Sequence, residues 1–317
     1  MTVPQPAEHT TTPGGSANLA GRSVARIGFG VMQLGFAKIT PETGAAILRQ
    51  AIDAGVNHLD TAQFYGPCND LIRTALSPYS DDLVLVSKVG AEVTPDAGLV
   101  TAQRPTQLRE QVEANLTALG AERLDVVNLR RADTGPGVVA EADQLVDLDS
   151  QLGALAELRD AGKIGGIGLS NVSADQIRQA LPAGIACVQN AYSVLNRSDE
   201  PALELCREQR IAWVPFFPLG SALPGIPKVT DNPTVVSSAA ELDVTPAQLG
   251  LSWLLAHDPG TLLIPGTASP GHLADNIAAG DLQLSDEIVA RLDALGSNSQ
   301  PLSSFRVTEA DVADRLR

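Results

Sequence analysis

Short apolar runs alternate along this chain with longer stretches in which apolar residues recur at every third or fourth position. Runs of the first kind indicate buried strands, and stretches of the second kind indicate amphipathic helices. The strand-like runs cover residues 25–31, 56–60, 83–88, 124–130, 164–170, 185–189, 211–216 and 262–265. The helical patterns cover residues 42–54, 105–119, 148–161, 174–180, 201–208 and 245–256. Eight strands with intervening helices predict an α/β fold, a (β/α)8 TIM barrel in a single domain.

A doubly wound parallel sheet would show the same alternation, but it needs a glycine-rich phosphate turn after an early strand. The candidate turn here begins Gly28-Phe29-Gly30, and Gln33 stands where the third glycine of that motif belongs. We therefore prefer the barrel. Its two longest connections, residues 90–104 and 132–147, follow strands, and such loops form the mouth of a barrel's active site.

Composition narrows the possible partners. The 317 residues carry 22 basic and 37 acidic side chains, a net charge of −15, which argues against a nucleic acid or an anionic membrane as a partner. No apolar run approaches the roughly 18 residues that a membrane span needs. Cys68, Cys187 and Cys206 share no metal-binding spacing, so reduced thiols in a cytoplasmic protein are the simplest interpretation. The composition specifies no oligomeric state.

The two ends of the chain differ from its middle. Residues 1–17 are rich in Thr, Pro, Gly and Ser and lack the basic start and apolar centre of a signal peptide, so we expect a disordered leader. The barrel is expected to span residues 18–300. A C-terminal tail, residues 301–317, follows it and contains a helical pattern at 308–316.

Three predicted strands end in charged residues. Because side chains alternate along a strand, Asp60, Lys88 and Arg130 can all point inward and converge at the C-terminal rim, where barrel enzymes place their chemistry. A single charged residue at the end of a strand is as easily a side chain exposed to solvent. Three such residues with matching parity favour a catalytic site. Tyr65 follows Asp60 by five residues, and a Lys anchored by an Asp lowers the pKa of a nearby phenol.

The same parity places His58 and Asn128 one layer below Asp60 and Arg130. Barrel layers draw side chains from alternate strands, so we expect these two side chains to meet and form a hydrogen bond. His58 then has a structural role.

The run Asn-His-Leu-Asp-Thr-Ala-Gln-Phe-Tyr-Gly at 57–66, with Lys88 one strand later, resembles the aldo-keto reductases. The similarity spans about residues 25–295 and includes the Ile-Pro-Gly to Asp-Asn stretch at 264–276. It implies reversible hydride transfer from NAD(P)H to an aldehyde or ketone, with Tyr65 as proton donor and Lys88, held by Asp60, tuning it. It also implies a hairpin at 16–24 that closes the barrel floor.

This chain departs from the family at one catalytic position. The fourth strand of these reductases usually supplies a His, and Arg130 stands at the matching position. Arg can donate a hydrogen bond to the substrate carbonyl, but it cannot act as a neutral base near pH 7.

The resemblance further implies a nicotinamide cofactor held along the later strands. The matching residues are Ser170, Asn171 and Gln189 for the carboxamide, Phe216 for ring stacking, Leu219, Gly220 and Ser221 for the pyrophosphate, and Ile264, Gly266, Thr267, Ser269, His272, Asp275 and Asn276 for the adenosine part. Outside the family context, an aromatic pair at a strand end such as Phe216-Phe217 is most often core packing. Positions that usually bind the 2′-phosphate with Lys or Arg read Gly266, Ala268 and His272 here. NADP is therefore preferred, with NAD as a possible alternative.

The stretch 56–66 and the Val-Val-Asn-Leu-Arg run at 126–130 look like a bacterial branch that includes pyridoxal reductases, which implies a pyridoxal-like substrate. Two alternatives stay open. A non-catalytic, cofactor-sensing barrel subunit would explain the missing His, but it need not keep Asp60, Tyr65 and Lys88 together. A metal-dependent hydrolase would need His or carboxylates grouped at strand ends, whereas the four histidines are scattered, and we expect no metal site.

Overall fold

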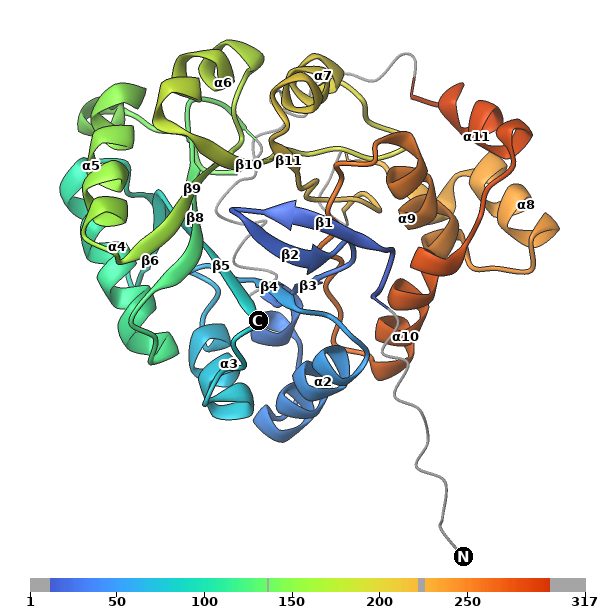
Figure 1. Ribbon diagram of the computed structural model, residues 1–317, viewed down its shortest axis with the longest axis horizontal. Helices are drawn as coiled ribbons and strands as arrows, with labels where there is room; N and C mark the ends of the chain where they lie inside the picture. The colour runs from blue at the N-terminus through green and yellow to red at the C-terminus, as the bar shows by residue number, and fades with distance from the viewer. Residues whose placement is uncertain (1–11, 136, 222–225, 297–317) are drawn as a thin grey trace, which may run out of the picture.

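A ring of parallel strands lies at the centre of the molecule, surrounded by helices (Figure 1). A computed structural model describes residues 12–135, 137–221 and 226–296. Seven strands are hydrogen-bonded in the order β11-β10-β9-β8-β5-β4-β3. Their bounds are β3 Phe29–Gly30, β4 His58–Asp60, β5 Val84–Val89, β8 Leu124–Arg130, β9 Ile164–Ser170, β10 Ile185–Gln189 and β11 Ala212–Trp213.

The eighth strand position closes the ring. Leu262 N donates to Trp213 O at 2.8 Å, and Leu263 N donates to Arg26 O at 2.7 Å. Parallel bridges pair Trp213 with Thr261 and Ile27 with Leu263. Residues 261–263 therefore join the last strand to the first, and the predicted (β/α)8 barrel is confirmed.

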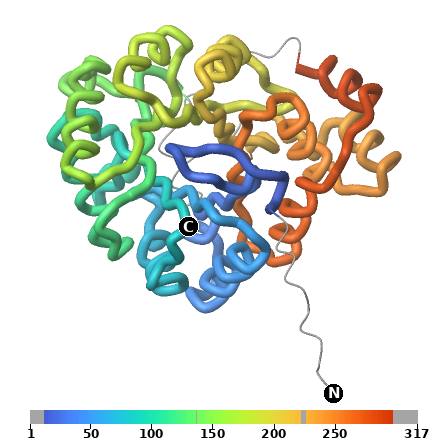
Figure 2. The backbone as a smooth tube through the Cα atoms, in the orientation of Figure 1, coloured from blue at the N-terminus to red at the C-terminus, as the bar shows by residue number. Residues whose placement is uncertain are grey.

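Helices follow the strands around the outside (Figures 1 and 2). The structure has α1 Met32–Phe36, α2 Pro41–Asp53, α3 Cys68–Leu76, α4 Pro105–Leu119, α5 Leu148–Asp160, α6 Ala174–Ala180, α7 Glu200–Gln209, α8 Pro233–Glu241, α9 Pro246–His257, α10 Pro270–Ala278 and α11 Asp286–Asp293. The short helices α1, α3, α8, α10 and α11 were not among the patterns identified in the sequence. Three of them, α8, α10 and α11, begin at side-chain caps, Asn232, Ser269 and Ser285, which accept from N–H groups of the first helical turn.

An antiparallel hairpin closes the N-terminal end of the barrel, as the resemblance implied. Strands β1, Ser16–Leu19, and β2, Arg22–Ala25, lie across the barrel axis in Figure 1. Leu19 and Val24, each at most 2 % exposed, pack with apolar side chains from inside the barrel. Strand β1 begins at Ser16, within the segment 1–17 that we expected to be disordered. Residues 1–11 and the predicted tail, 301–317, lie outside the described residues.

Two long loops frame the opposite end. The connection at 90–104 contains an unpredicted hairpin of β6, Ala91–Thr94, and β7, Gly98–Thr101. The second loop is tied down by Arg131, which pairs with Asp133 and donates to Val146 O at 2.9 Å. No helix within the described part of the chain is long and apolar enough to cross a membrane.

Candidate active site

A buried ion pair lies at the C-terminal rim of the barrel. Lys88, on β5, donates to Asp60 Oδ1 and to Thr61 O, the latter at 3.2 Å, and Asp60 and Lys88 are 3 % and 5 % exposed. Gln189 Nε2 occupies the second carboxylate oxygen of Asp60 at 2.7 Å. Lys88 Nζ lies 5.1 Å from the centroid of the Tyr65 ring. The three residues that the sequence placed in one group are therefore in contact.

The charges of this group set its protonation. Burial lowers the pKa of Lys88, but Asp60 and Tyr65 raise that pKa by more, so the ammonium is stabilised. Burial raises the pKa of the Tyr65 phenol; Lys88 and Arg130 lower it, and Asp60 raises it further. The lowering by Lys88 and Arg130 is as expected, but the net shift of the Tyr65 pKa is upward, because burial and Asp60 together outweigh the two cations. Tyr65 consequently keeps its proton at neutral pH and can donate it.

Arg130 ends β8 on the same rim, and its guanidinium is close enough to Tyr65 for each to shift the other's pKa. Burial lowers the pKa of Arg130, and Tyr65 raises it. Gly137, at φ 101°, lies against the guanidinium, because a Cβ there would sit 2.7 Å from Arg130 Nη2. Gln103 Nε2 donates to Gly90 O at 2.6 Å and to Arg130 O at 2.8 Å, which joins the ends of β5 and β8.

A chain of buried polar side chains lies behind the ion pair and was not found from the sequence. Thr61 Oγ1 donates to Asn69 Oδ1 at 2.8 Å, and Asn69 Nδ2 donates to Asn115 Oδ1 at 2.9 Å. Ser87 Oγ donates to the same Asn115 oxygen at 2.7 Å. Thr61 and Ser87 adjoin Asp60 and Lys88 in the sequence, so this chain couples the two strands that carry the ion pair to α3 and α4. The sequence held one sign of this chain of hydrogen bonds: Thr61 and Ser87 are polar at positions where strand alternation points the side chain outward, toward the helices.

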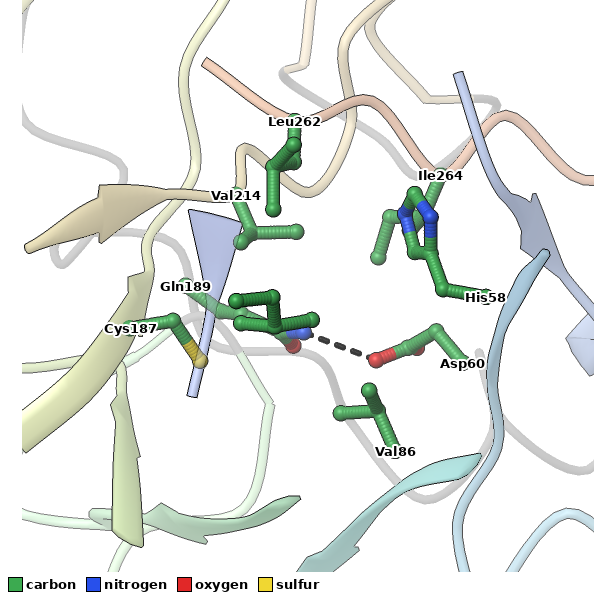
Figure 3. Close-up of a pocket in the computed structure, with 9 residues that line it drawn as sticks. His58, Asp60, Val86, Cys187, Gln189, Val214, Leu262 and Ile264 are labelled. Carbon is green, nitrogen blue, oxygen red and sulfur yellow. Dashed lines mark hydrogen bonds between the residues drawn. The ribbon is translucent and has the colours of Figure 1, made fainter. Parts of the chain in front are cut away.

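The layer below the ion pair differs from the prediction. His58 and Asn128 do not bond to each other: Asn128 Oδ1 accepts from Cys187 Sγ at 3.2 Å, and within the described residues both His58 ring nitrogens have no partner. The His58 ring fills the space above Gly28, where a Cβ would collide with it. Figure 3 shows this ring beside Ile264. Both side chains border a cavity of about 10 Å³. Burial lowers the pKa of His58 to about 4, so the ring is neutral. The space holds about one water molecule, so this layer is structural.

The carboxamide candidates lie at the ends of β9 and β10. Ser170 and Gln189 are 2 % and 1 % exposed. Asn171, at φ 59°, donates through Nδ2 to Arg131 O at 3.1 Å and to Thr134 O at 2.9 Å, so its amide positions the mouth loop. Gln189 Oε1 is buried and, among the described residues, has no hydrogen-bond partner. This acceptor suits an amide N–H of a ligand, because a buried acceptor without a donor is destabilising.

The ring-stacking candidate, Phe216, and the pyrophosphate candidates, Leu219, Gly220 and Ser221, follow β11. Phe216 and Phe217 pack edge to face with ring centroids 5.1 Å apart, and both rings are half-buried. Leu219 O accepts from Val229 N at 3.1 Å, and Ser221 is likewise half-buried. Gly220 has φ 79°, and a Cβ there would collide with Pro227 O. Only glycine allows the two backbone segments to approach this closely.

The adenosine candidates surround the start of α10. Gly266 lies against Gln33 and Gly30 O, where a side chain would not fit. Thr267 Oγ1 accepts from Ser269 N at 3.0 Å, and Ser269 caps the helix by accepting from His272 N at 3.4 Å. Ile264 and Asp275 are half-buried, His272 is exposed, and Asn276 is buried. These residues, which the resemblance selected, therefore form one continuous segment at a helix N-terminus, a favourable position for a phosphate.

Comparison with known proteins decides the family. The sequence matches the Aldo/keto reductase family over residues 26–297. This chain belongs to that family. It is 42 % identical to the pyridoxine 4-dehydrogenase of Escherichia coli over 285 residues, 87 % of this chain and 96 % of that protein. It is 27 % identical to the NADP(+) aldo-keto reductase yakc of Schizosaccharomyces pombe, over 89 % of this chain and 91 % of that one. Its fold matches a thermostable aldo-keto reductase crystallised with epalrestat (TM-score 0.74, 27 % identity, 89 % and 100 % covered).

The family identification confirms three predictions. The chain is an NAD(P)-dependent aldo-keto reductase, its fold is the (β/α)8 barrel, and its reaction is carbonyl reduction with a nicotinamide cofactor. The similarity also extends to the pyridoxal-reductase-like branch. Nothing in these comparisons favours the non-catalytic sensing barrel, and a metal-dependent hydrolase is not supported.

Proposed function

We propose that Tyr65 is the proton donor of this aldo-keto reductase, that Lys88 and Asp60 hold it in place, and that Arg130 polarises the substrate carbonyl. The observation that carries this proposal is the buried Asp60–Lys88 pair beneath the Tyr65 ring. When bound, the nicotinamide supplies the hydride. Lys88 and Arg130 both favour negative charge on the Tyr65 oxygen, so they stabilise the phenolate that remains after the proton leaves.

The described residues fit a nicotinamide cofactor. Gln189 Oε1 offers a buried acceptor to the carboxamide. Phe216 follows β11, the strand next to β10, and Gly220 allows the backbone to approach a pyrophosphate closely. Ser170 and Asn171 complete the carboxamide end. We propose NADP over NAD, because Thr267, Ser269 and the N–H groups at the start of α10 can bind the 2′-phosphate without a Lys or Arg.

For the substrate, we propose a pyridoxal-like aldehyde. The support is the 42 % identity to a pyridoxine 4-dehydrogenase along nearly its whole length. A cationic group at Arg130, in place of the neutral His usual in the family, also suits a substrate that carries negative charge.

The test is oxidation of NADPH and NADH by the purified protein with pyridoxal and a panel of aldehydes. Tyr65→Phe should lower turnover by about 10²- to 10⁴-fold, the usual contribution of a placed acid, and leave cofactor binding intact. Tyr79→Phe is the matched control, because Tyr79 donates to Leu119 O at 2.5 Å on the outside of the barrel. Near-normal turnover in Tyr65→Phe would refute the role of this tyrosine.

A further inference from the structure

Both ends of the Lys88 side chain are tied to one amide, that of Asn115 on α4. At the base of the lysine, Ser87 Oγ donates to Asn115 Oδ1 at 2.7 Å. At its tip, Lys88 Nζ donates to Thr61 O at 3.2 Å, and Thr61 Oγ1 donates to Asn69 Oδ1 at 2.8 Å. Asn69 Nδ2 then donates to the same Asn115 oxygen at 2.9 Å. These residues form a closed ring of covalent and hydrogen bonds, so a displacement of Asn115 moves both ends of the lysine.

Gln111 holds the same strand one helical turn away. It precedes Asn115 by four positions on α4, so the two side chains lie on one face of the helix. Gln111 Oε1 accepts from Gly90 N at 2.7 Å, and Asn115 Nδ2 donates to Gln111 O at 2.8 Å. Gly90, at φ 107°, is the residue at which the chain leaves β5. The helix therefore holds β5 on both sides of Lys88.

The polar side chains of this frame lower stability, which argues against a purely structural role. Asn69, Ser87, Gln111 and Asn115 are each at most 5 % exposed. Gln111 Nε2 is buried and, among the described residues, has no hydrogen-bond partner. A buried donor without an acceptor is destabilising, and an apolar side chain at this position would avoid the loss. Polar groups kept against stability are expected where function requires a fixed geometry.

We propose that Asn115 and Gln111 are positioning residues for the chemical step, which they serve by placing the Lys88 ammonium beside the Tyr65 ring. This inference rests on the proposed function and deepens it, because it extends the acid–base group to a helix outside the barrel. Lys88 Nζ lies 5.1 Å from the centroid of that ring. The attraction between an ammonium and a phenolate falls with distance, so a displaced Lys88 stabilises the Tyr65 phenolate less as the proton leaves.

The test is a double-mutant cycle with Lys88→Met. The kcat with NADPH and the fastest aldehyde of the panel is measured for the wild type, Asn115→Leu, Lys88→Met and the double variant. Asn115→Leu should lower kcat by about 10- to 100-fold, because a displacement of about 1 Å can lower a rate by about 10²-fold. In the Lys88→Met background, the same substitution should change kcat by less than about twofold, because the lysine that it positions is gone. The Kd for NADPH, from fluorescence titration, should be unchanged.

Gln111 supplies a matched pair of variants. Gln111→Glu keeps the acceptor for Gly90 N and loses only an amide nitrogen that makes no hydrogen bond within the described part of the chain. Gln111→Met has nearly the same length and removes the acceptor. We expect kcat to fall by about tenfold in Gln111→Met and to be largely retained in Gln111→Glu. Thermal melting identifies any variant that fails to fold, and this pair keeps the test decisive if Asn115→Leu is one of them.

Ser252→Ala is the control for the loss of a buried hydrogen bond elsewhere. Ser252, on α9, lies across the barrel from α4 in Figure 1 and is 2 % exposed. Its Oγ donates to Gln248 O at 2.8 Å and to Ala279 O at 2.7 Å. Ser252→Ala should lower the melting temperature and leave kcat unchanged.

The inference would be overturned if Asn115→Leu lowered kcat by the same factor with and without Lys88, or by no more than Ser252→Ala does. Tyr65→Phe and Lys88→Met separate this failure from failure of the proposed function. If both of these variants lose turnover while folded Asn115→Leu keeps it, only the positioning role is contradicted. If neither loses turnover, both the positioning role and the proposed function are contradicted.

Discussion

The two halves of the barrel rim are built in different ways. Around β4, β5 and β8, charged side chains bind one another: Lys88 and Gln189 occupy both oxygens of Asp60, and a buried chain through Asn115 fixes the strands behind them. After β9 and at the start of α10, polar side chains bind backbone groups instead. Ser269 caps its helix, and Asn171 holds a loop. The acid–base group is therefore assembled in advance, whereas the cofactor half offers backbone groups and one buried acceptor.

Gln189 connects these halves. Its Nε2 donates to Asp60, and its Oε1 has no partner among the described residues (Figure 3). A side chain fixed at one end holds its other end in a defined direction. The carboxamide acceptor is thus oriented by the same carboxylate that anchors Lys88.

The largest effect should come from breaking the preassembled half. Lys88→Met leaves Asp60 buried without its cation and should cost about 3–5 kcal/mol of unfolding free energy in urea titrations. Turnover should also fall by about 10²-fold or more, because Tyr65 loses the nearby charge. The double variant Asp60→Asn/Lys88→Met should regain stability without regaining activity.

The matched control is Lys163→Met, which removes an exposed ion pair with Glu113 and should cost under about 1 kcal/mol. Equal losses of unfolding free energy in Lys88→Met and Lys163→Met would show that the buried pair contributes no more to stability than the exposed one.

An intermediate effect concerns the layer beneath this half. The pKa of His58 is lowered from 6.5 to about 4, so the unfolded chain takes up a proton that the folded protein resists. Stability from this residue is present above about pH 6.5 and is lost as pH falls toward 4, by roughly 3 kcal/mol in total. Urea unfolding between pH 7 and pH 4 should show a shallower loss in His58→Met.

His272→Gln is the control for that series, since His272 is exposed. Identical pH dependence in His58→Met and the wild type would mean that His58 takes up its proton in the folded state at its ordinary pKa.

The smallest effect should come from the cofactor half. In Gly220→Ala, the new methyl group collides with Pro227 O, so we expect the Kd for NADPH to rise by about tenfold while the chemical step changes little. Gly98 has a similar φ, 63° against 79°, but a Cβ added there would have no atom within 4 Å. Gly98→Ala therefore introduces the backbone strain without the collision. Fluorescence titration measures both. The same Kd in the two variants would contradict a cofactor role for this loop.

Much of this arrangement could be predicted because it depends on local alternation. The parity of Asp60, Lys88 and Arg130 follows from the strand repeat alone, and the structure brings all three to one rim. The cofactor residues were selected by resemblance, and they lie at the ends of β9 and β10, after β11 and around the start of α10. The β6–β7 hairpin and short helices such as α8 and α11 escaped prediction, because their apolar patterns are too short to show a period.

The sequence by itself determined the alternation of strands and helices and the inward direction of the catalytic candidates, since each depends on residues near in the chain. Closure of the barrel instead joins residues far apart, such as Arg26 and Leu263. Only the tertiary structure decided which distant groups meet. Gln189 reaches Asp60 across 129 positions, and Asn128 bonds Cys187 instead of His58. The direction of the Tyr65 pKa shift was decided in the same way. It is set by how much water the fold removes from the phenol, and that depends on every element packed around it.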